Sequence, residues 1–228
     1  MQGERAATIR LTIDTHEAAV ASHRVVDNRQ TKPAALRAAA EATVHTVELA
    51  ENLLLLARAD AGRLDLHREQ FDLAEVLEGV CDHLRALAES VGLEVRAKLP
   101  PELVVVADRR AVSLIVQNLV DNAIKYGDSD GCICIEARAI NGEAEVIVKN
   151  NGEPIPPERA PHIFERFYRA RSDGRILGQG LGLSIACALA KAHGGKLELV
   201  RSAQEWTEFR LLLPVNRVCI AQREPALA

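Results

Sequence analysis

The spacing of apolar residues divides the chain into a helical first part and a mixed second part. Over residues 6–61 the apolar side chains recur every three or four positions, and no glycine occurs before the Ala-Gly step that ends the segment. We expect two helices here. The first carries an apolar stripe made of Ile9, Ile13, His16 and Val20.

A break between the two helices is predicted at residues 28–33. Thr31 can cap the second helix, and Pro33 suits its first turn because the missing N–H has no partner there. A helix over 34–59 is about 39 Å long at 1.5 Å per residue. Two copies of the hairpin would form a four-helix bundle, although the hairpin can instead fold back on its own chain. The stripe that needs covering is Ala40, Val44, Val47 and Leu54.

After Gly62 the pattern changes to alternating strands and amphipathic helices. An Asn141-Gly142 pair between two alternating runs predicts a β-hairpin. The predicted helices are 73–91, 109–125, 183–193 and a short piece at 163–169; the predicted strands are 93–95, 103–107, 133–139, 144–149, 196–202 and 207–213. The fold class is therefore α+β.

Composition narrows the class of protein. The chain has 228 residues, 48% of them hydrophobic and 26% charged, with a net charge of −4. No basic stripe stands out, so we expect no nucleic-acid partner.

The apolar runs are far shorter than the ~20 residues of a membrane span, and no signal peptide is visible, so a cytoplasmic protein is predicted. The five cysteines include no C-x-x-C pair; Cys132 and Cys134 share a strand face, where packing is the simpler role than metal ligation.

Four polar or glycine-rich segments carry the candidate chemistry. On the helix 109–125, Asn118, Asn122 and Lys125 share one face, where amide oxygens suit Mg²⁺ and the ammonium suits phosphate. Without the other segments, a solvated polar stripe is the favoured interpretation of these residues. The next segment, 150–158, follows a strand; Asn150 can accept from an adenine amino group, whereas read alone it is a proline-rich turn.

The other two segments are aromatic and glycine-rich. Residues 163–169 interleave aromatic side chains with arginines that can reach phosphate, or they form a hydrophobic anchor. In residues 178–183 the alternating glycines open a helix, where backbone N–H groups can approach phosphate oxygens. No strand leads directly into this turn, which excludes a Rossmann fingerprint.

In this order the four segments resemble the N, G1, F and G2 boxes of the histidine-kinase catalytic domain, a member of the GHKL ATPase superfamily. The resemblance covers about 71–214, and LLLLARADAGR at 53–63 looks like the end of the family's dimerisation hairpin. It implies a Bergerat-type α/β sandwich behind a hairpin that forms a four-helix bundle in a dimer. The expected boundaries are 1–66 for the hairpin, 67–216 for the ATP-binding domain and 217–228 for a loose tail.

The resemblance also assigns roles to residues. Asn122 would be the Mg²⁺ ligand, supported by Asn118 as a catalytic residue, and residues 165–180 would form a mobile lid. Thr207 would lie near the adenine that Asn150 reads. The full set of expected ATP-binding residues is Asn118, Asn122, Lys125, Tyr126, Asn150, Gly152, Ile155, Phe167, Arg169, Gly178, Gln179, Gly180, Leu181, Gly182, Leu183 and Thr207.

Two departures in the G1 box bear on affinity. Most family members have an aspartate at the position of Asn150 and a second glycine at that of Pro154. An amide oxygen still accepts from an adenine amino group, but the bond loses its charge assistance, worth about 1 kcal/mol. We expect weaker ATP binding rather than none.

The phosphoacceptor is the largest departure. The family's acceptor lies in a pattern resembling H-E-x-x-T-P, and counting back from the end of the hairpin places it at about residues 3–6, which hold no histidine. His16-Glu17 reproduces the first two letters but not the rest. His16 is therefore a candidate acceptor, with an ordinary helix residue as the alternative.

Three functions remain open at the level of sequence. The first is a dimeric histidine-kinase core that binds ATP-Mg²⁺ and acts with the receiver domain of a response regulator. The second is a degenerate transmitter or phosphotransfer module without autokinase activity. A GHKL hydrolase is disfavoured because Asn118 stands where those enzymes place a glutamate base, and an anti-sigma-type serine kinase would lack the hairpin.

Overall fold

The computed structural model describes residues 31–169, 179–203 and 205–215. The chain divides into two compact units, Met1–Ala50 and Glu51–Ala228. Helix α2 (Thr31–Asp60) confirms the predicted second helix, with Pro33 in its first turn. The predicted first helix and His16 lie outside the described residues. In the described ranges no helix combines the length and the apolar character that a membrane span requires.

The second unit contains a mixed sheet whose strands run in the order β2-β4-β5-β7-β6. Only β2 and β4 are parallel; the other neighbours are antiparallel. The strands are β2 (Glu94–Lys98), β4 (Cys132–Ile140), β5 (Glu143–Asn150), β6 (Lys196–Ser202) and β7 (Thr207–Pro214). As predicted, Asn141 and Gly142 turn β4 into β5, both with positive φ.

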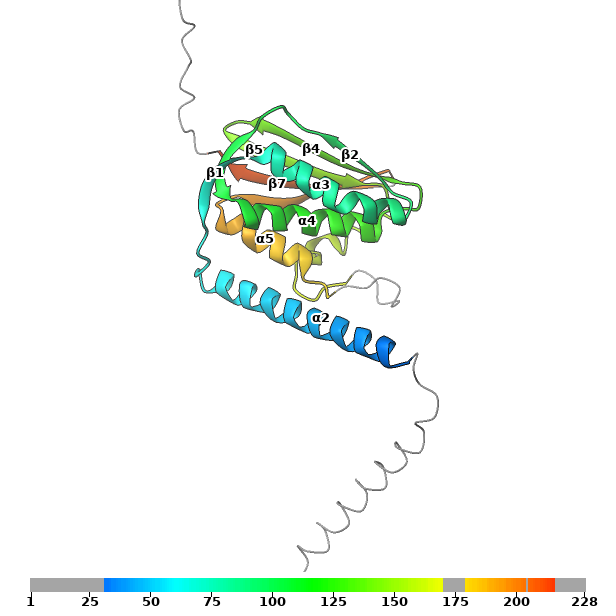
Figure 1. Ribbon diagram of the computed structural model, residues 1–228. Coiled ribbons are helices and arrows are strands. Elements are labelled where there is room, and N and C mark those ends of the chain that lie inside the picture. The colour runs from blue at the N-terminus through cyan, green and yellow to red at the C-terminus, as the bar shows by residue number, and fades with distance from the viewer. Residues whose placement is uncertain (1–30, 170–178, 204, 216–228) are drawn as a thin grey trace, which may run out of the picture. The chain divides into compact units, whose positions relative to one another are not determined.

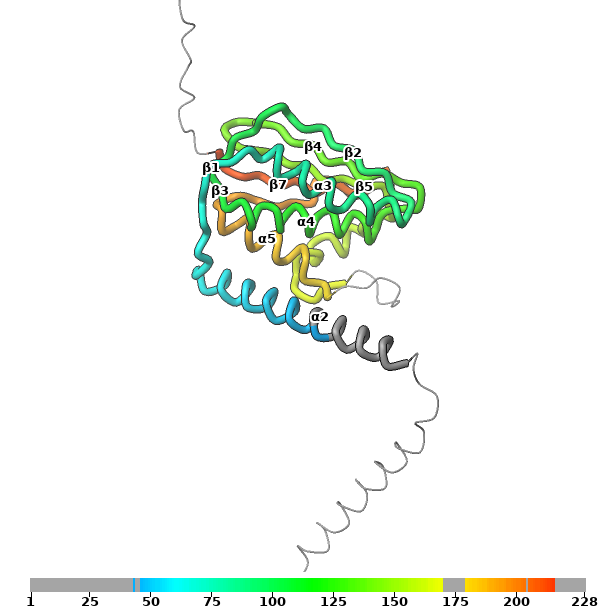
Figure 2. Tube along the Cα trace, in the orientation of Figure 1, coloured from blue at the N-terminus to red at the C-terminus, as the bar shows by residue number. Residues whose placement is uncertain are grey.

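Three helices cover one face of this sheet (Figure 1): α3 (Leu73–Ser90), α4 (Arg109–Tyr126) and α5 (Gly182–Ala192). Helices α4 and α5 lie side by side (Figure 2). Alternate residues of β7 point into this layer, so Phe209, Leu211 and Leu213 are at most 1% exposed. Each such side chain contributes about 1.5–3 kcal/mol by leaving water. The α+β prediction is confirmed.

Two local predictions were wrong or incomplete. A strand β1 (Arg68–Asp72), antiparallel to β3 (Val104–Asp108), was not predicted because only Phe71 of its five residues is buried, which leaves no alternating pattern. The helical piece expected at 163–169 lies earlier, as a single 3₁₀ turn at Ala160–His162 with Pro161 as its second residue. Residues 163–167 form turns and a bend, and Phe167 has a φ of 61°, which a right-handed helix does not contain.

Asp108 fixes where α4 begins. Its Oδ1 accepts from the backbone N–H of Ala111 at 2.9 Å, which caps the helix, and Oδ2 accepts from the N–H of His67 at 2.8 Å. The N–H of Asp108 donates to Nε2 of buried His193 at 3.1 Å. Nδ1 of His193 lies 2.8 Å from the carbonyl of Leu189. The start of α4 and the end of α5 are thereby joined, which aligns the two helices that carry the candidate site.

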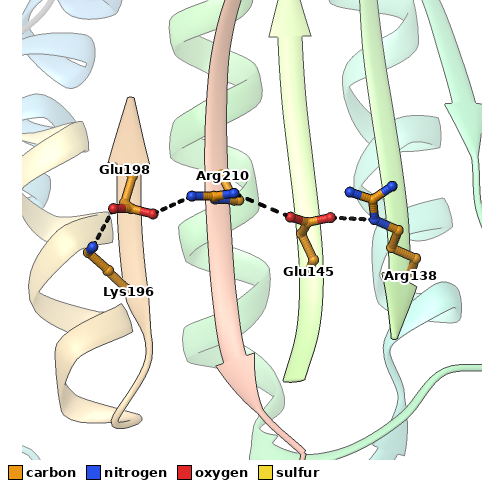
Figure 3. Close-up of polar contacts among 5 residues, drawn as sticks. All are labelled: Arg138, Glu145, Lys196, Glu198 and Arg210. Atoms are coloured by element: carbon orange, nitrogen blue, oxygen red, sulfur yellow. Dashed lines mark hydrogen bonds and ion pairs between the residues drawn. The ribbon is translucent and has the colours of Figure 1, made fainter. Parts of the chain in front are cut away.

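The opposite face of the sheet carries a row of ion pairs (Figure 3). Glu145 lies between Arg138 and Arg210, and Arg210 also contacts Glu198, which contacts Lys196 in turn. Although Glu145 is on the uncovered face, its side chain is only 3% exposed, because the two guanidinium groups cover it. This face is therefore polar and internally paired.

Candidate functional site

The candidate site begins on one face of α4. Asn118 is half-buried, and its Nδ2 donates to the carbonyl of Leu114 at 2.9 Å, which leaves Oδ1 as the free acceptor end of the amide. Asn122 is also half-buried, and Lys125 is exposed at the last turn. In the described part of the chain, no hydrogen bond or ion pair of Asn122 or Lys125 commits either side chain to a protein partner.

The start of α5 lies directly against this face. A Cβ atom placed on Gly182 would be 2.7 Å from Oδ1 of Asn118, closer than carbon and oxygen can approach. Only glycine permits this distance. The structure thus brings together the N-box asparagine and the G2-box glycine, which are 64 positions apart in the sequence.

The G1 turn meets the other end of α4. A Cβ atom on Gly152 would lie 2.2 Å from the carbonyl oxygen of Tyr126, and Gly152 forms a β-bridge with Gly127. The N–H of Asp128 donates to the carbonyl of Asn151 at 3.1 Å. The close backbone approach explains why glycine is required at position 152.

Asn150 and Thr207 are paired across β5 and β7, and both are buried, at 3% and 5% exposure. Nδ2 of Asn150 donates to the carbonyl of Asn151 at 2.9 Å, which leaves Oδ1 able to accept. Oγ1 of Thr207 lies 3.0 Å from Oγ of Ser202, and that hydroxyl accepts from the N–H of Ile155 at 2.7 Å. These few polar groups lie on an otherwise apolar core face. Such a surface suits a flat heterocycle that forms hydrogen bonds along one edge.

The F-box segment contacts the glycine segment. Gly180 has a φ of 69°, and a Cβ placed there would lie 2.7 Å from the carbonyl oxygen of Tyr168. Phe167 has positive φ and is 57% exposed. Gln179 and Leu183 are half-buried beside this contact, whereas Leu181 is buried. Arg169 is exposed, and Gly178 and most of the expected lid lie outside the described residues.

A cavity of about 690 Å³ lies on the outer side of α5. It is lined by the end of α2, by residues 164–166 and by Cys187 and Lys191 of α5. Oδ1 of Asp60 contacts a guanidinium nitrogen of Arg166 at 2.6 Å beside it. None of the residues predicted to bind nucleotide lines this cavity, so we place the site by its converging glycines and amides instead.

The arrangement fits a triphosphate nucleotide. Glycine backbone at residues 180 and 182 leads into the N-terminus of α5, where N–H groups and the helix dipole favour anions. The described residues contain no group of three or more His, Cys, Asp or Glu side chains suited to a metal. A divalent ion here would thus rely on amide oxygen, phosphate and water, a hard-donor set that Mg²⁺ accepts.

Two residues of the site were not predicted. Asn151 accepts at Oδ1 from the N–H of Cys132 at 2.9 Å and donates from Nδ2 to the carbonyl of Glu205 at 2.9 Å. Ser202 supports Thr207, as described above. Ser202 carries no sequence signal, but the second asparagine of the Asn-Asn-Gly run was a usable indication of a side chain that holds the turn.

Known proteins match the region of the chain that contains the candidate site. Residues 107–217 match the family described as histidine kinase-, DNA gyrase B-, and HSP90-like ATPase. The histidine protein kinase DivJ of Caulobacter vibrioides is 34% identical over 173 residues, which cover 75% of this chain and 29% of DivJ. Among the first curated relatives the chain spans between 29% and 40% of their length.

Two solved structures share the fold. Full-length ShkA in complex with AMPPNP superposes with a TM-score of 0.73 at 26% identity, over 83% of this chain and 40% of ShkA. The histidine kinase ThkA in complex with the response regulator TrrA has a TM-score of 0.62 at 23% identity, over 94% of this chain and 61% of that one. The second likeness concerns the fold alone. From the ordered boxes, the converging glycines and these matches, residues 107–217 form an ATPase domain of the histidine kinase-, DNA gyrase B-, and HSP90-like family, in a chain that is similar to sensor histidine kinases over about three quarters of its length.

Proposed function

We propose that the chain is the cytoplasmic core of a two-component histidine kinase, which binds ATP with Mg²⁺ for phosphoryl transfer towards a response regulator. One observation carries this proposal. Gly182 lies against Asn118 and Gly152 lies against Tyr126, so the N, G1 and G2 segments meet at α4. These three segments lie far apart in the sequence, and a nucleotide site of the expected kind requires them to lie together, as they do at α4.

Within this site the adenine would lie by Asn150 and Thr207, and the phosphates by the start of α5. Lys125, exposed at the end of α4, would neutralise phosphate charge. Asn122 would hold the Mg²⁺, with Asn118 beside it; the ion supplies charge stabilisation for the transferred phosphoryl group when bound. The protein's own contribution is to orient the nucleotide, because amides and glycines perform no proton transfer.

Exposed apolar side chains of α2 support a dimer. Val47 and Leu54 are seven positions apart on the helix and are 52% and 51% exposed. A second copy of the chain would cover them in a four-helix bundle. Leu54→Lys should therefore shift the mass in solution from dimer to monomer. Leu87→Lys, at an apolar residue of α3 that is 51% exposed, should leave the mass unchanged.

The proposed partner is the receiver domain of a response regulator. ThkA, whose fold this chain shares, was solved with such a protein, TrrA. Binding between the purified chain and a receiver domain, with and without ATP, measures this directly. No binding to any receiver domain encoded with the kinase would contradict the assignment.

A degenerate transmitter is the second candidate function. The sequence lacks a histidine at the expected acceptor position, and His16 has only part of the usual context. Such a module would bind nucleotide or a partner without phosphorylating itself. The glycine contacts at α4 favour retained nucleotide binding, so the two candidates differ only at the acceptor.

Incubation with γ-labelled ATP and Mg²⁺ separates them. An autokinase gives protein-bound label that is acid-labile, base-stable and absent from His16→Ala. Label that persists in His16→Ala would assign the acceptor to another residue. ATP binding without any label would establish the degenerate transmitter.

A further inference from the structure

Cys132 and Cys134 form a close thiol pair on the uncovered face of the sheet. They are two positions apart on β4, so their side chains leave the strand on the same side. Their Sγ atoms are 3.3 Å apart. Cys132 is 8% exposed and Cys134 is half-buried, so the pair is partly accessible from this face.

The same strand end is bound to the G1 turn. The N–H of Cys132 donates to Oδ1 of Asn151 at 2.9 Å, and the N–H of Asn151 donates to the carbonyl of Cys132 at 3.3 Å. Asn151 also accepts from Asp128 after α4 and donates to Glu205 before β7. A change in the backbone at Cys132 would therefore be passed to Asn151, which directly follows Asn150, and to its partners Asp128 and Glu205.

Burial and the neighbouring cations shift the pKa of Cys134 in opposite directions. Burial, and then the neighbouring Cys132, raise the pKa of Cys134 to about 11, while Lys149 and Arg96 lower it. The flanking carboxylates on this face are paired with these cations, Glu94 with Arg96 and Glu136 with Lys149. Because the pKa of Cys134 is raised and the thiolate is the nucleophile, we expect oxidation at neutral pH to be slow.

We propose that Cys132 and Cys134 are a redox-sensitive dithiol, oxidised by a hydroperoxide to a disulfide within β4 that weakens nucleotide binding. The effect on binding rests on the proposed function; the disulfide itself does not. The contact between the two sulfurs and the paired hydrogen bonds to Asn151 carry this inference.

The chemistry balances with the hydroperoxide as the oxidant. The Cys134 thiolate attacks the peroxide oxygen, the O–O bond breaks, and the alcohol, or water, leaves with one proton while a sulfenic acid remains. The Cys132 sulfur then attacks the sulfenyl sulfur. The S–S bond forms, the S–O bond breaks, and hydroxide leaves as water with the Cys132 proton. Two thiols lose two electrons, which the peroxide gains.

Formation of the disulfide draws the two sulfurs from 3.3 Å to about 2.0 Å and favours a shorter strand. Residues two apart on an extended strand have Cα atoms about 6.6 Å apart, near the upper end of the range that disulfides span, whereas their preferred separation is about 5.5–6 Å. The contraction would fall between Cys132 and Cys134 and pull on the hydrogen bonds to Asn151. Loss of those bonds would loosen the G1 turn.

The test uses the full chain. After treatment with hydrogen peroxide, alkylation and tryptic digestion without reductant, residues 126–138 form one peptide that contains Cys132 and Cys134 and no other cysteine. We expect this peptide to lack two hydrogens and to carry no alkyl group. ATP affinity should fall on the order of tenfold and recover with dithiothreitol. Cys134→Ser should bind ATP normally and show no such loss, and Cys187→Ser is the matched control that retains the pair.

Several results would overturn the proposal. They are alkylation of both thiols after peroxide, disulfides from either thiol to another cysteine, or a disulfide that leaves hydrogen exchange of the 150–153 amides unchanged. If the reduced chain fails to bind ATP at all, the proposed function fails. In that case the peptide mass and the hydrogen exchange still show whether Cys132 and Cys134 form a disulfide that loosens the G1 turn.

Discussion

Gly182 and Asn118 touch so closely that a methyl group on Gly182 would lie 2.7 Å from the Asn118 amide oxygen. The contact joins the start of α5 to the middle of α4, and the proposed phosphate site lies at this junction. A side chain at position 182 would rotate the Asn118 amide or move the helix start. The geometry of the site should therefore be more sensitive here than the stability of the fold.

Gly182→Ala tests this relationship. We expect ATP affinity to fall about tenfold, or about 1.4 kcal/mol, while the free energy of unfolding changes little, because the displaced amide can turn toward solvent. Calorimetric titration and urea unfolding measure the two quantities. Gly79→Ala is the control. Gly79 lies in α3, and beyond the adjacent residues and the backbone of its own helix no atom lies within 4 Å of the added methyl, so the chain should become about 0.5–1 kcal/mol more stable with unchanged affinity. Equal affinity in both variants would argue against the site.

Asn150→Asp tests whether the side chain at position 150 hydrogen-bonds to the adenine. A carboxylate restores charge assistance to the bond with the adenine amino group, so affinity for ATP should rise about fivefold. The nucleotide-free chain should lose about 1–3 kcal/mol of stability, because the buried side chain no longer donates to the carbonyl of Asn151. Asn141→Asp makes the same charge change in the β4–β5 turn and should affect neither quantity. Unchanged affinity in Asn150→Asp would place the adenine elsewhere.

Asp108 makes a prediction about pH. Burial raises its pKa, but the backbone N–H groups of Ala111, His67 and Arg110 outweigh this, and the pKa of Asp108 lies below its ordinary value. The stabilisation is complete above the unfolded value of about 3.9 and is lost as pH falls through the lower folded value. Asp108→Ala should thus cost about 1–2 kcal/mol at pH 7, and the difference from the native chain should shrink below about pH 4.

Urea unfolding between pH 7 and pH 3 measures that difference. Asp82→Ala is a suitable control, since Asp82 is exposed and its ion-pair partner in the described ranges is Arg85 on the same helix. The change should alter stability by less than about 0.5 kcal/mol at every pH. A cost for Asp108→Ala that persists at pH 3 would show that its hydrogen bonds do not depend on ionisation.

The row of ion pairs gives a further prediction. Glu145→Gln leaves Arg138 and Arg210 without the carboxylate between them, and the change should cost about 1–2 kcal/mol. The cost is limited because Arg138 is 62% exposed and can be solvated. Glu94→Gln breaks an exposed pair with Arg96 and should cost less than about 0.5 kcal/mol. Thermal unfolding of both variants decides, and equal losses would show that burial of Glu145 adds nothing.

Local patterns predicted most of the fold because they act within a few residues. The Asn141-Gly142 turn and the alternation of β7 both depend on neighbours in sequence. The glycines at 152 and 182 were predicted as site residues because their boxes are local too. The similarity of known kinases confirms the family, and the individual roles within the site stay predictions.

What the sequence could not show depends on distant partners. His193 accepts from Asp108, 85 positions away, and no local pattern signals a buried histidine with that role. Strand β1 exists because it pairs with β3, not because its own residues alternate. Likewise Arg138, Glu145 and Arg210 read as ordinary surface charges until the strand order places them in one row.

The proposed ATP-Mg²⁺ site is tested most directly by the affinity of Asn122→Ala for ATP in the presence of Mg²⁺, measured by calorimetric titration beside the native chain. Gln117→Ala, on the same helix, is the control because the one partner of the Gln117 side chain among the described residues is Ser113, at 3.3 Å. We expect Asn122→Ala to lose Mg²⁺-dependent binding while Gln117→Ala keeps it. Equal affinity of Asn122→Ala and the native chain would contradict the assignment of the site.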